Sequence, residues 1–183
     1  MLFILFSAFS SFLLLLGLIP FLRSQLLDLP NYRSSHSQPM PRGGGVSFVI
    51  ISSASSGLAF ITGQISTVSL CPLFFLPLAV VGFIDDRQDL SPAWRYLVQL
   101  FTSILIVFMS PLVAGFGIPK SFSSFFHLLF IVLLVIGVTA VINFINFMDG
   151  LDGLVCGCLV VMITSASIQL SAPWPIWALV GSL

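Results

Sequence analysis

The stretch Asn143–Leu154 reads Asn-Phe-Ile-Asn-Phe-Met-Asp-Gly-Leu-Asp-Gly-Leu and guides the interpretation of the whole chain. It places two carboxamides and two carboxylates at intervals of three residues, at the end of a long apolar run. On a continuous helix this spacing drifts by about 60° per step, so Asn143 and Asp152 would face opposite ways. Gly150 and Gly153 allow the backbone to leave the helix here. The pattern predicts polar side chains that converge on an ion or ligand, with a glycine-capped polar helix end as the structural alternative.

The composition is typical of an integral membrane protein. Hydrophobic residues make up 58% of the chain and charged residues 7%, whereas a soluble domain carries about 25% charged residues. We therefore expect an all-α polytopic helical bundle of six complete spans. A seventh span begins near Trp174 and covers about half a crossing by Leu183, which favours an incomplete chain. The predicted complete spans are residues 2–22, 45–61, 68–84, 93–113, 125–147 and 154–170.

The few charged residues predict the orientation of these spans. Five of the six basic residues fall in loops on one side of the membrane, and only Lys120 falls on the other. Positive loops stay in the cytoplasm, so residues 23–44, 85–92 and 143–154 are predicted on the cytoplasmic face. The six acidic residues are all aspartates, and five of them lie in two short clusters on this face. The zero net charge argues against a general nucleic-acid binder.

The first predicted loop ends in a glycine-rich turn. It contains three prolines and has no apolar periodicity, which predicts a non-helical excursion. Arg42, Gly43 and Gly44 lie at the start of the second span, where backbone amides beside an arginine suit an anion such as phosphate. A simple hinge is the alternative reading of the glycines. His36 is a candidate phosphate contact or ligand, with an ordinary loop histidine as the alternative.

The second cluster consists of Asp85, Asp86 and Asp89 at the end of the third span. A helical continuation would gather two of these carboxylates on one face. Such a group fits Mg²⁺ binding, or the orientation of a phosphate through a metal. The alternative is an interfacial stop in which Arg87 and Arg95 pair with the acids, with Arg95 also acting as an interfacial anchor beside two aromatic residues.

Taken together, three motifs resemble a known family. They are Asp28-Leu-Pro-Asn-Tyr-Arg-Ser-Ser-His with Pro41-Arg-Gly-Gly, then Asp85-Asp-x-x-Asp, then Asn143-x-x-Asn-x-x-Asp-Gly-x-Asp-Gly-Leu. In order and spacing they are similar to the first three cytoplasmic motifs of the polyprenyl-phosphate N-acetylhexosamine-1-phosphate transferases, the glycosyltransferase family 4 superfamily. The resemblance covers nearly the whole chain from Asp28 onward and points to the bacterial branch, in the inner (plasma) membrane.

The resemblance implies an activity and a role for each motif. Members of the family transfer a sugar 1-phosphate from a UDP-N-acetylhexosamine to undecaprenyl phosphate, release UMP, and use Mg²⁺, which Mn²⁺ can replace. This reaction initiates cell-envelope polysaccharides such as lipopolysaccharide O-antigen. By resemblance, the catalytic carboxylates are Asp85 and Asp86, the metal site includes Asn146 and Asp149, and the substrate-binding residues are Asp152, Asn143, Asp89, Arg42, Gly43, Gly44 and His36.

The chain also departs from the family pattern. Two later cytoplasmic elements, one of which bears an aspartate that completes the Mg²⁺ site, have no counterpart before Leu183. We therefore expect residues 1–183 to be a single transmembrane domain, the N-terminal half of a larger transferase, and to be inactive alone. A cation-coupled transporter fragment and a structural membrane subunit are the alternatives. The transporter would place its ion ligands near the bilayer midplane, whereas these acids fall at the predicted ends of spans.

Overall fold

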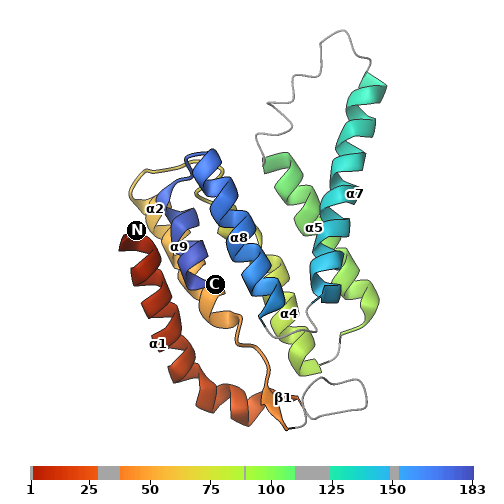
Figure 1. Cartoon of the computed structure of the whole chain (residues 1–183). Coiled ribbons are helices and arrows are strands. Elements are labelled where there is room, and N and C mark those ends of the chain that lie inside the picture. Colours follow the sequence, from red (N-terminus) through yellow and green to blue (C-terminus); the bar gives the residue numbers. More distant parts are fainter. Residues whose placement is uncertain (1, 29–37, 89, 110–123, 149–152) are drawn as a thin grey trace.

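The computed structural model describes residues 2–28, 38–88, 90–109, 124–148 and 153–183 of the chain. Most of them are helical (Figure 1). Two groups of helices lie side by side: α1, α2, α8 and α9 form one, α5 and α7 form the other, and α4 contacts both. The elements are α1 (Leu2–Gln25), β1 (Leu27–Asp28), β2 (Met40–Pro41), α2 (Val46–Ile61), α3 (Cys71–Phe74), α4 (Leu76–Gln88), α5 (Pro92–Met109), α7 (Ser124–Met148), α8 (Leu154–Gln169) and α9 (Trp174–Ser182).

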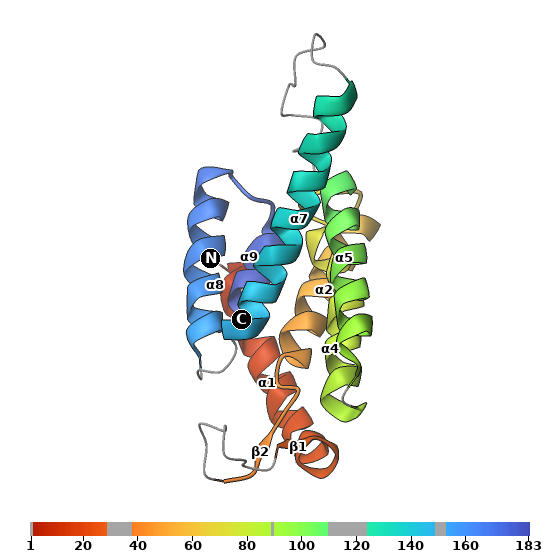
Figure 2. The same cartoon turned by 90° about the vertical axis from the view of Figure 1, so that its right-hand side faces the viewer.

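Most helices coincide with the predicted apolar runs. α1, α2, α7 and α8 begin within one residue of the predicted starts, and α9 begins at the predicted Trp174. α5 begins one residue earlier than predicted and is described as far as Met109. The two short strands are a departure from the all-α prediction, because they pair as an antiparallel ladder at the lower end of the bundle (Figure 2).

The predicted span over residues 68–84 is not one continuous helix. This region contains the one-turn helix α3, a break at Phe75, and then α4. Pro72 lies in the first turn of α3, and Pro77 is the second residue of α4. A proline ring clashes with the carbonyl four residues earlier and lacks an N–H, so the first turn of a helix such as α4 accommodates it more easily than the interior does. The apolar composition gave no sign of this break.

Three helices of the described residues are long and apolar enough to cross a membrane. They lie at Leu2–Gln25, Pro92–Met109 and Phe125–Asn146. α2 and α8 are shorter apolar helices of 16 residues each. A mainly helical protein with helices suited to cross a membrane is therefore confirmed, whereas six complete spans stay a prediction.

Large apolar side chains lie on the outside of the bundle, and small polar side chains lie inside. Phe6 is 74% exposed, whereas Ser7, the next residue of α1, is 2% exposed. Most buried polar residues of the described segments are serines and threonines. A protein surrounded by water shows the opposite arrangement. Small polar residues at helix interfaces, with apolar residues facing outward, are typical of helices packed in lipid.

α9 packs closely against α1 and α2. Ser11 of α1 donates a hydrogen bond to the carbonyl oxygen of Ser182, at 2.9 Å, and lies 3.2 Å from the hydroxyl of Ser47 on α2. A Cβ atom at Gly181 would lie 2.8 Å from the Cα atom of Ile4 and would overlap the Ile4 carbonyl oxygen. The backbones of α1 and α9 therefore meet at a position that accommodates only glycine.

The ladder of β1 and β2 closes the base of the first loop. Leu27 is paired with Pro41, and the amide of Arg42 donates to the carbonyl of Leu26 at 2.8 Å. The chain then turns into α2 through Gly43, which has a φ of +85°. This left-handed conformation favours glycine, because a Cβ atom would clash with the backbone. The turn therefore requires glycine at position 43 for its own backbone conformation, independently of any ligand.

We expect Gly43→Ala to destabilise the protein by about 1–2 kcal/mol. Alanine at position 43 would be held at an unfavourable φ, and its Cβ atom would lie 3.2 Å from the side chains of both Leu22 and Leu26. Gly17→Ala in α1 is the matched control, since no atom lies within 4 Å of its Cβ position. The control is expected to be neutral or stabilising. Unfolding of the purified chain in mixed micelles measures both, and equal stabilities for the two variants would contradict the prediction.

Candidate functional site

Asp85 and Asp86 lie in the last turn of α4. The helix continues to Gln88, so these two residues are helical, whereas the prediction placed them in a loop over residues 85–92. Consecutive residues on a helix point about 100° apart. The Asp85 side chain is 24% exposed and turns toward α5, whereas Asp86 is exposed. The two neighbouring carboxylates therefore have different surroundings.

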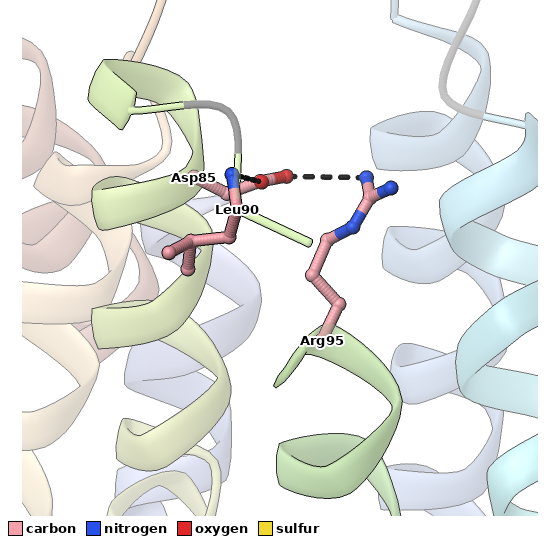
Figure 3. A network of polar contacts seen from close by, with 3 residues as sticks. All are labelled: Asp85, Leu90 and Arg95. Carbon is pink, nitrogen blue, oxygen red and sulfur yellow. Dashed lines mark hydrogen bonds and ion pairs between the residues drawn. The ribbon is translucent and has the colours of Figure 1, made fainter. Parts of the chain in front are cut away.

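Asp85 joins the end of α4 to the start of α5 (Figure 3). Its Oδ1 atom accepts a hydrogen bond from the backbone amide of Leu90 at 2.8 Å. Its Oδ2 atom accepts a hydrogen bond from Nη1 of Arg95 at 3.2 Å, and the two charged groups form an ion pair. Both oxygens of this carboxylate are engaged, and each holds a different part of the connection between the two helices.

The first loop meets the end of α4. Arg87 donates from Nη2 to the side-chain oxygen of Gln25 at the end of α1, at 3.4 Å, and its guanidinium lies 6.0 Å from the ring centroid of Phe83. A Cβ atom at Gly43 would lie 3.8 Å from the same Phe83 ring. The glycine-rich turn and the aspartate pair, predicted from separate parts of the sequence, are therefore neighbours.

The third motif is aligned with this site through α5. The hydroxyl groups of Thr139 on α7 and Ser103 on α5 are hydrogen-bonded at 2.9 Å, and both residues are buried. The two helices run in opposite directions (Figure 1), so one turn toward the lower end places Asn143 level with Gln99. Arg95 lies one turn beyond Gln99. The start of the third motif therefore lies about one helical turn from the level of the Asp85–Arg95 pair.

The orientation of the Asn143 carboxamide is determined by its own helix. Its Nδ2 atom donates to the carbonyl oxygen of Thr139 at 2.9 Å. A carbonyl oxygen can only accept, so the nitrogen must face it and the Oδ1 atom must point away. Asn146 follows one turn later on α7 and is exposed. Both carboxamides are thus carried on one regular helix.

α7 ends at Met148, and Gly153, the residue directly before α8, has a φ of +74°. The predicted break in the helix is confirmed, as is the use of a glycine conformation at Gly153. Four of the predicted site residues lie outside the described part of the chain, and their roles stay predictions: His36, Asp89, Asp149 and Asp152.

Three contributors to this geometry were not assigned a role in the predicted site. Leu90, Ser103 and Thr139, which supply one backbone amide and two hydroxyl groups, do not belong to any of the sequence motifs. Arg95 was considered as a partner for the acids only in the alternative interpretation, and the structure places it on Asp85. The signal that could have found this pair is the proline at position 92, which starts a new helix and brings Arg95 back toward α4.

The donor chemistry at this end of the bundle is suited to a hard cation. Carboxylate and carboxamide oxygens are the ligands that Mg²⁺ prefers. Within the described segments, no group of three or more His, Cys, Asp or Glu side chains is arranged to hold a metal ion. Asp85, Asp86 and Asn146 are donors of this type at one end of the bundle, and the Mg²⁺ site that the sequence motif assigns to Asn146 stays a prediction.

An apolar helical bundle with helices long enough to cross a membrane is typical of an integral membrane protein. Residues 67–181, well over half of the chain, match the family described as glycosyl transferase family 4. The chain belongs to this family. The matched residues include α3, α4, α5, α7 and α8, and so contain both the aspartate pair and the asparagine motif.

Two curated relatives have the same name, undecaprenyl-phosphate alpha-N-acetylglucosaminyl 1-phosphate transferase. The protein of Pasteurella multocida is 35% identical over 82 residues, and that of Haemophilus influenzae is 31% identical over 85 residues. Each alignment covers 45% of this chain and 22% of the relative. No solved structure matches the chain. The similarity to these transferases therefore concerns about a fifth of their length.

Proposed function

We propose that this chain provides the acceptor side of a transferase site that moves an N-acetylhexosamine 1-phosphate from a UDP-sugar to undecaprenyl phosphate. An oxygen of the lipid phosphate attacks the sugar-bearing phosphorus of the donor. The bond between the two phosphates of the donor breaks, UMP leaves, and a lipid diphosphate sugar forms. Family membership and the names of the two relatives support this reaction class.

The observation that carries the proposal is the meeting of two motifs at one end of an apolar bundle. Gly43 and Phe83 bring the glycine-rich turn beside the helix end that bears Asp85 and Asp86. The lipid acceptor must keep its isoprenoid in the bilayer, whereas the sugar nucleotide is soluble. A site at a helix end satisfies both requirements, and the distribution of basic residues favours the cytoplasmic face of the inner membrane.

The nucleophile in this reaction is already an anion. The main tasks of the protein are therefore to align two negatively charged substrates and to neutralise the charge on the diphosphate. Mg²⁺, held by Asn146 and Asp149, would supply charge neutralisation when bound. Asp85 and Asp86 form the carboxylate pair near the lipid phosphate. The residues proposed to bind and shape the substrates are Asn143, Asp152, Asp89, Arg42, Gly43, Gly44 and His36.

A cation-coupled transporter is less well supported by the same geometry. Transporters of this kind bind their ions near the bilayer midplane, at interrupted helices. Asp85 and Asp86, the acidic side chains that the structure describes in the second motif, lie in the last turn of α4 beside the first loop. Their position at a helix end favours a substrate that arrives at the membrane surface.

Transfer of labelled sugar phosphate tests the proposal. Two proteins would be expressed in membranes depleted of the endogenous transferase: the 183-residue chain, and a fusion in which the whole chain is followed by the part of the Pasteurella multocida relative that lies after the aligned segment. Both receive labelled UDP-N-acetylglucosamine, undecaprenyl phosphate and Mg²⁺. We expect the fusion to transfer label into the lipid phase and to lose this activity when EDTA removes the metal.

The intact relative is the positive control. An inactive fusion that is inserted in the membrane at the level of the relative would contradict the proposal that these residues provide the acceptor side of the site. Transfer by the chain alone would support the proposed function and would overturn the expectation that residues 1–183 are inactive by themselves.

A further inference from the structure

Asp85 is held between the end of α4 and the start of α5. Both of its carboxylate oxygens accept hydrogen bonds, one from the Leu90 amide and one from Arg95 (Figure 3). Arg95 therefore contacts a carboxylate of the second motif without belonging to that motif.

We propose that Arg95 is a positioning residue, which acts through Asp85 to fix the end of α4 against the start of α5. This inference rests on the proposed function. It adds to the site a residue that lies outside the three sequence motifs.

Arg95 lies on α5, the helix that also contacts α7. α5 is paired with α7 through Ser103 and Thr139, and α7 carries Asn143. The same helix therefore contacts the aspartate pair at one end and supports the asparagine motif along its length. If Arg95 releases Asp85, the end of α4 can move relative to α5, and the two motifs lose their common support.

Arginine is suited to this task because its guanidinium is planar and always charged. The Arg95 side chain is 42% exposed, so solvent weakens the electrostatic attraction in the pair. The loss of the pair should therefore alter the geometry of the site more than the stability of the fold. A displacement of reacting groups by about 1 Å can reduce a rate by about 100-fold.

A double-mutant cycle tests the inference in the fusion that carries the whole chain. We expect Arg95→Gln to lower kcat by about 10- to 100-fold and to leave KM for both substrates within about twofold. Arg95→Lys should recover part of the rate. In an Asp85→Asn background, Arg95→Gln should change kcat by less than about twofold, because residues that act through one contact are not additive.

Arg87→Gln is the matched control. Arg87 is also an arginine in this connection, but it contacts Gln25 and Phe83 rather than Asp85. Its effect should add to that of Asp85→Asn. Full additivity between Arg95→Gln and Asp85→Asn would overturn the inference. So would a rise in KM for undecaprenyl phosphate alone, which would mean that Arg95 binds the lipid phosphate directly.

A second measurement separates this inference from the proposed function. The same variants are made in the 183-residue chain, and their thermal midpoints are measured in detergent. We expect a coupling of about 1–3 °C between positions 85 and 95, and none between positions 85 and 87. Absence of coupling would overturn the inference itself. If positions 85 and 95 are coupled in the thermal midpoints but the fusion is inactive, the proposed function is contradicted, and the Asp85–Arg95 pair is a structural contact only.

Discussion

Replacing Gly181 with leucine is expected to destabilise the protein by about 3 kcal/mol or more. A Cβ atom at this position would overlap the carbonyl oxygen of Ile4 and the hydroxyl of Ser7. The first of these is a backbone atom, so the strain cannot be relieved by rotating a side chain. α1 and α9 would have to separate, which would also break the hydrogen bond from Ser11 to the Ser182 carbonyl.

The control for this prediction is Gly137→Leu in α7. No atom lies within 4 Å of the Cβ position of Gly137, and the residue is exposed on the outside of the bundle. Unfolding in mixed micelles should show a large loss of stability for Gly181→Leu and little change in stability for Gly137→Leu. If the two variants are equally stable, α9 does not pack against α1 as closely as described.

Asp86→Asn is expected to reduce sugar-phosphate transfer by about 100-fold or more, because the carboxylate pair is proposed to align the lipid phosphate with the donor and misaligned groups react slowly. Asp86 is exposed in the last turn of α4, at the helix end proposed to meet the lipid phosphate. The substitution keeps the shape of the side chain and removes its charge. The fold should therefore be retained.

Initial rates of label transfer by the fusion, at saturating concentrations of both substrates, measure this effect. Gln88→Ala is the control, since Gln88 is exposed in the same turn of α4 and carries no charge. Asp86→Glu should retain more activity than Asp86→Asn. A rate for Asp86→Asn within about threefold of the unmodified fusion would exclude a direct role for this carboxylate.

The positions of the helices could be predicted well from the sequence. Apolar runs identified α1, α2, α7 and α8 to within one residue at their starts, because an element that must bury itself in lipid has little freedom in its composition. The helix break at Gly153 was also predictable, since glycine readily adopts the left-handed conformation that the backbone has there.

The break within the third predicted span was missed for a physical reason. Hydropathy is averaged over a window of residues and does not register the missing N–H of a single proline. That missing donor nevertheless disrupts the hydrogen bonding of the helix backbone. Pro77 therefore divides α3 from α4 although every residue around it is apolar or small. The short ladder of β1 and β2 was missed because two paired residues have no periodicity to detect.

The site was predictable as a set of residue types but not as a set of contacts. The motifs identified Asp85 and Asn143 without revealing what each one touches. The Leu90 amide that binds Asp85 is a backbone group, which any residue except proline supplies, so the side chain at position 90 gives no sign of it. The alignment of Asn143 with Gln99 depends on the register of two helices, which is set by the Ser103–Thr139 contact.

The paired strands at the base of the first loop have a consequence for how that loop can vary. Leu27 and Pro41 are held together by the ladder, so the ends of the intervening segment are fixed regardless of its content. The entropy of closing a flexible segment grows slowly with its length, by about 0.6 kcal/mol for each doubling. Related chains could therefore lengthen, shorten or exchange this segment without moving the glycine turn or the helix end beside it.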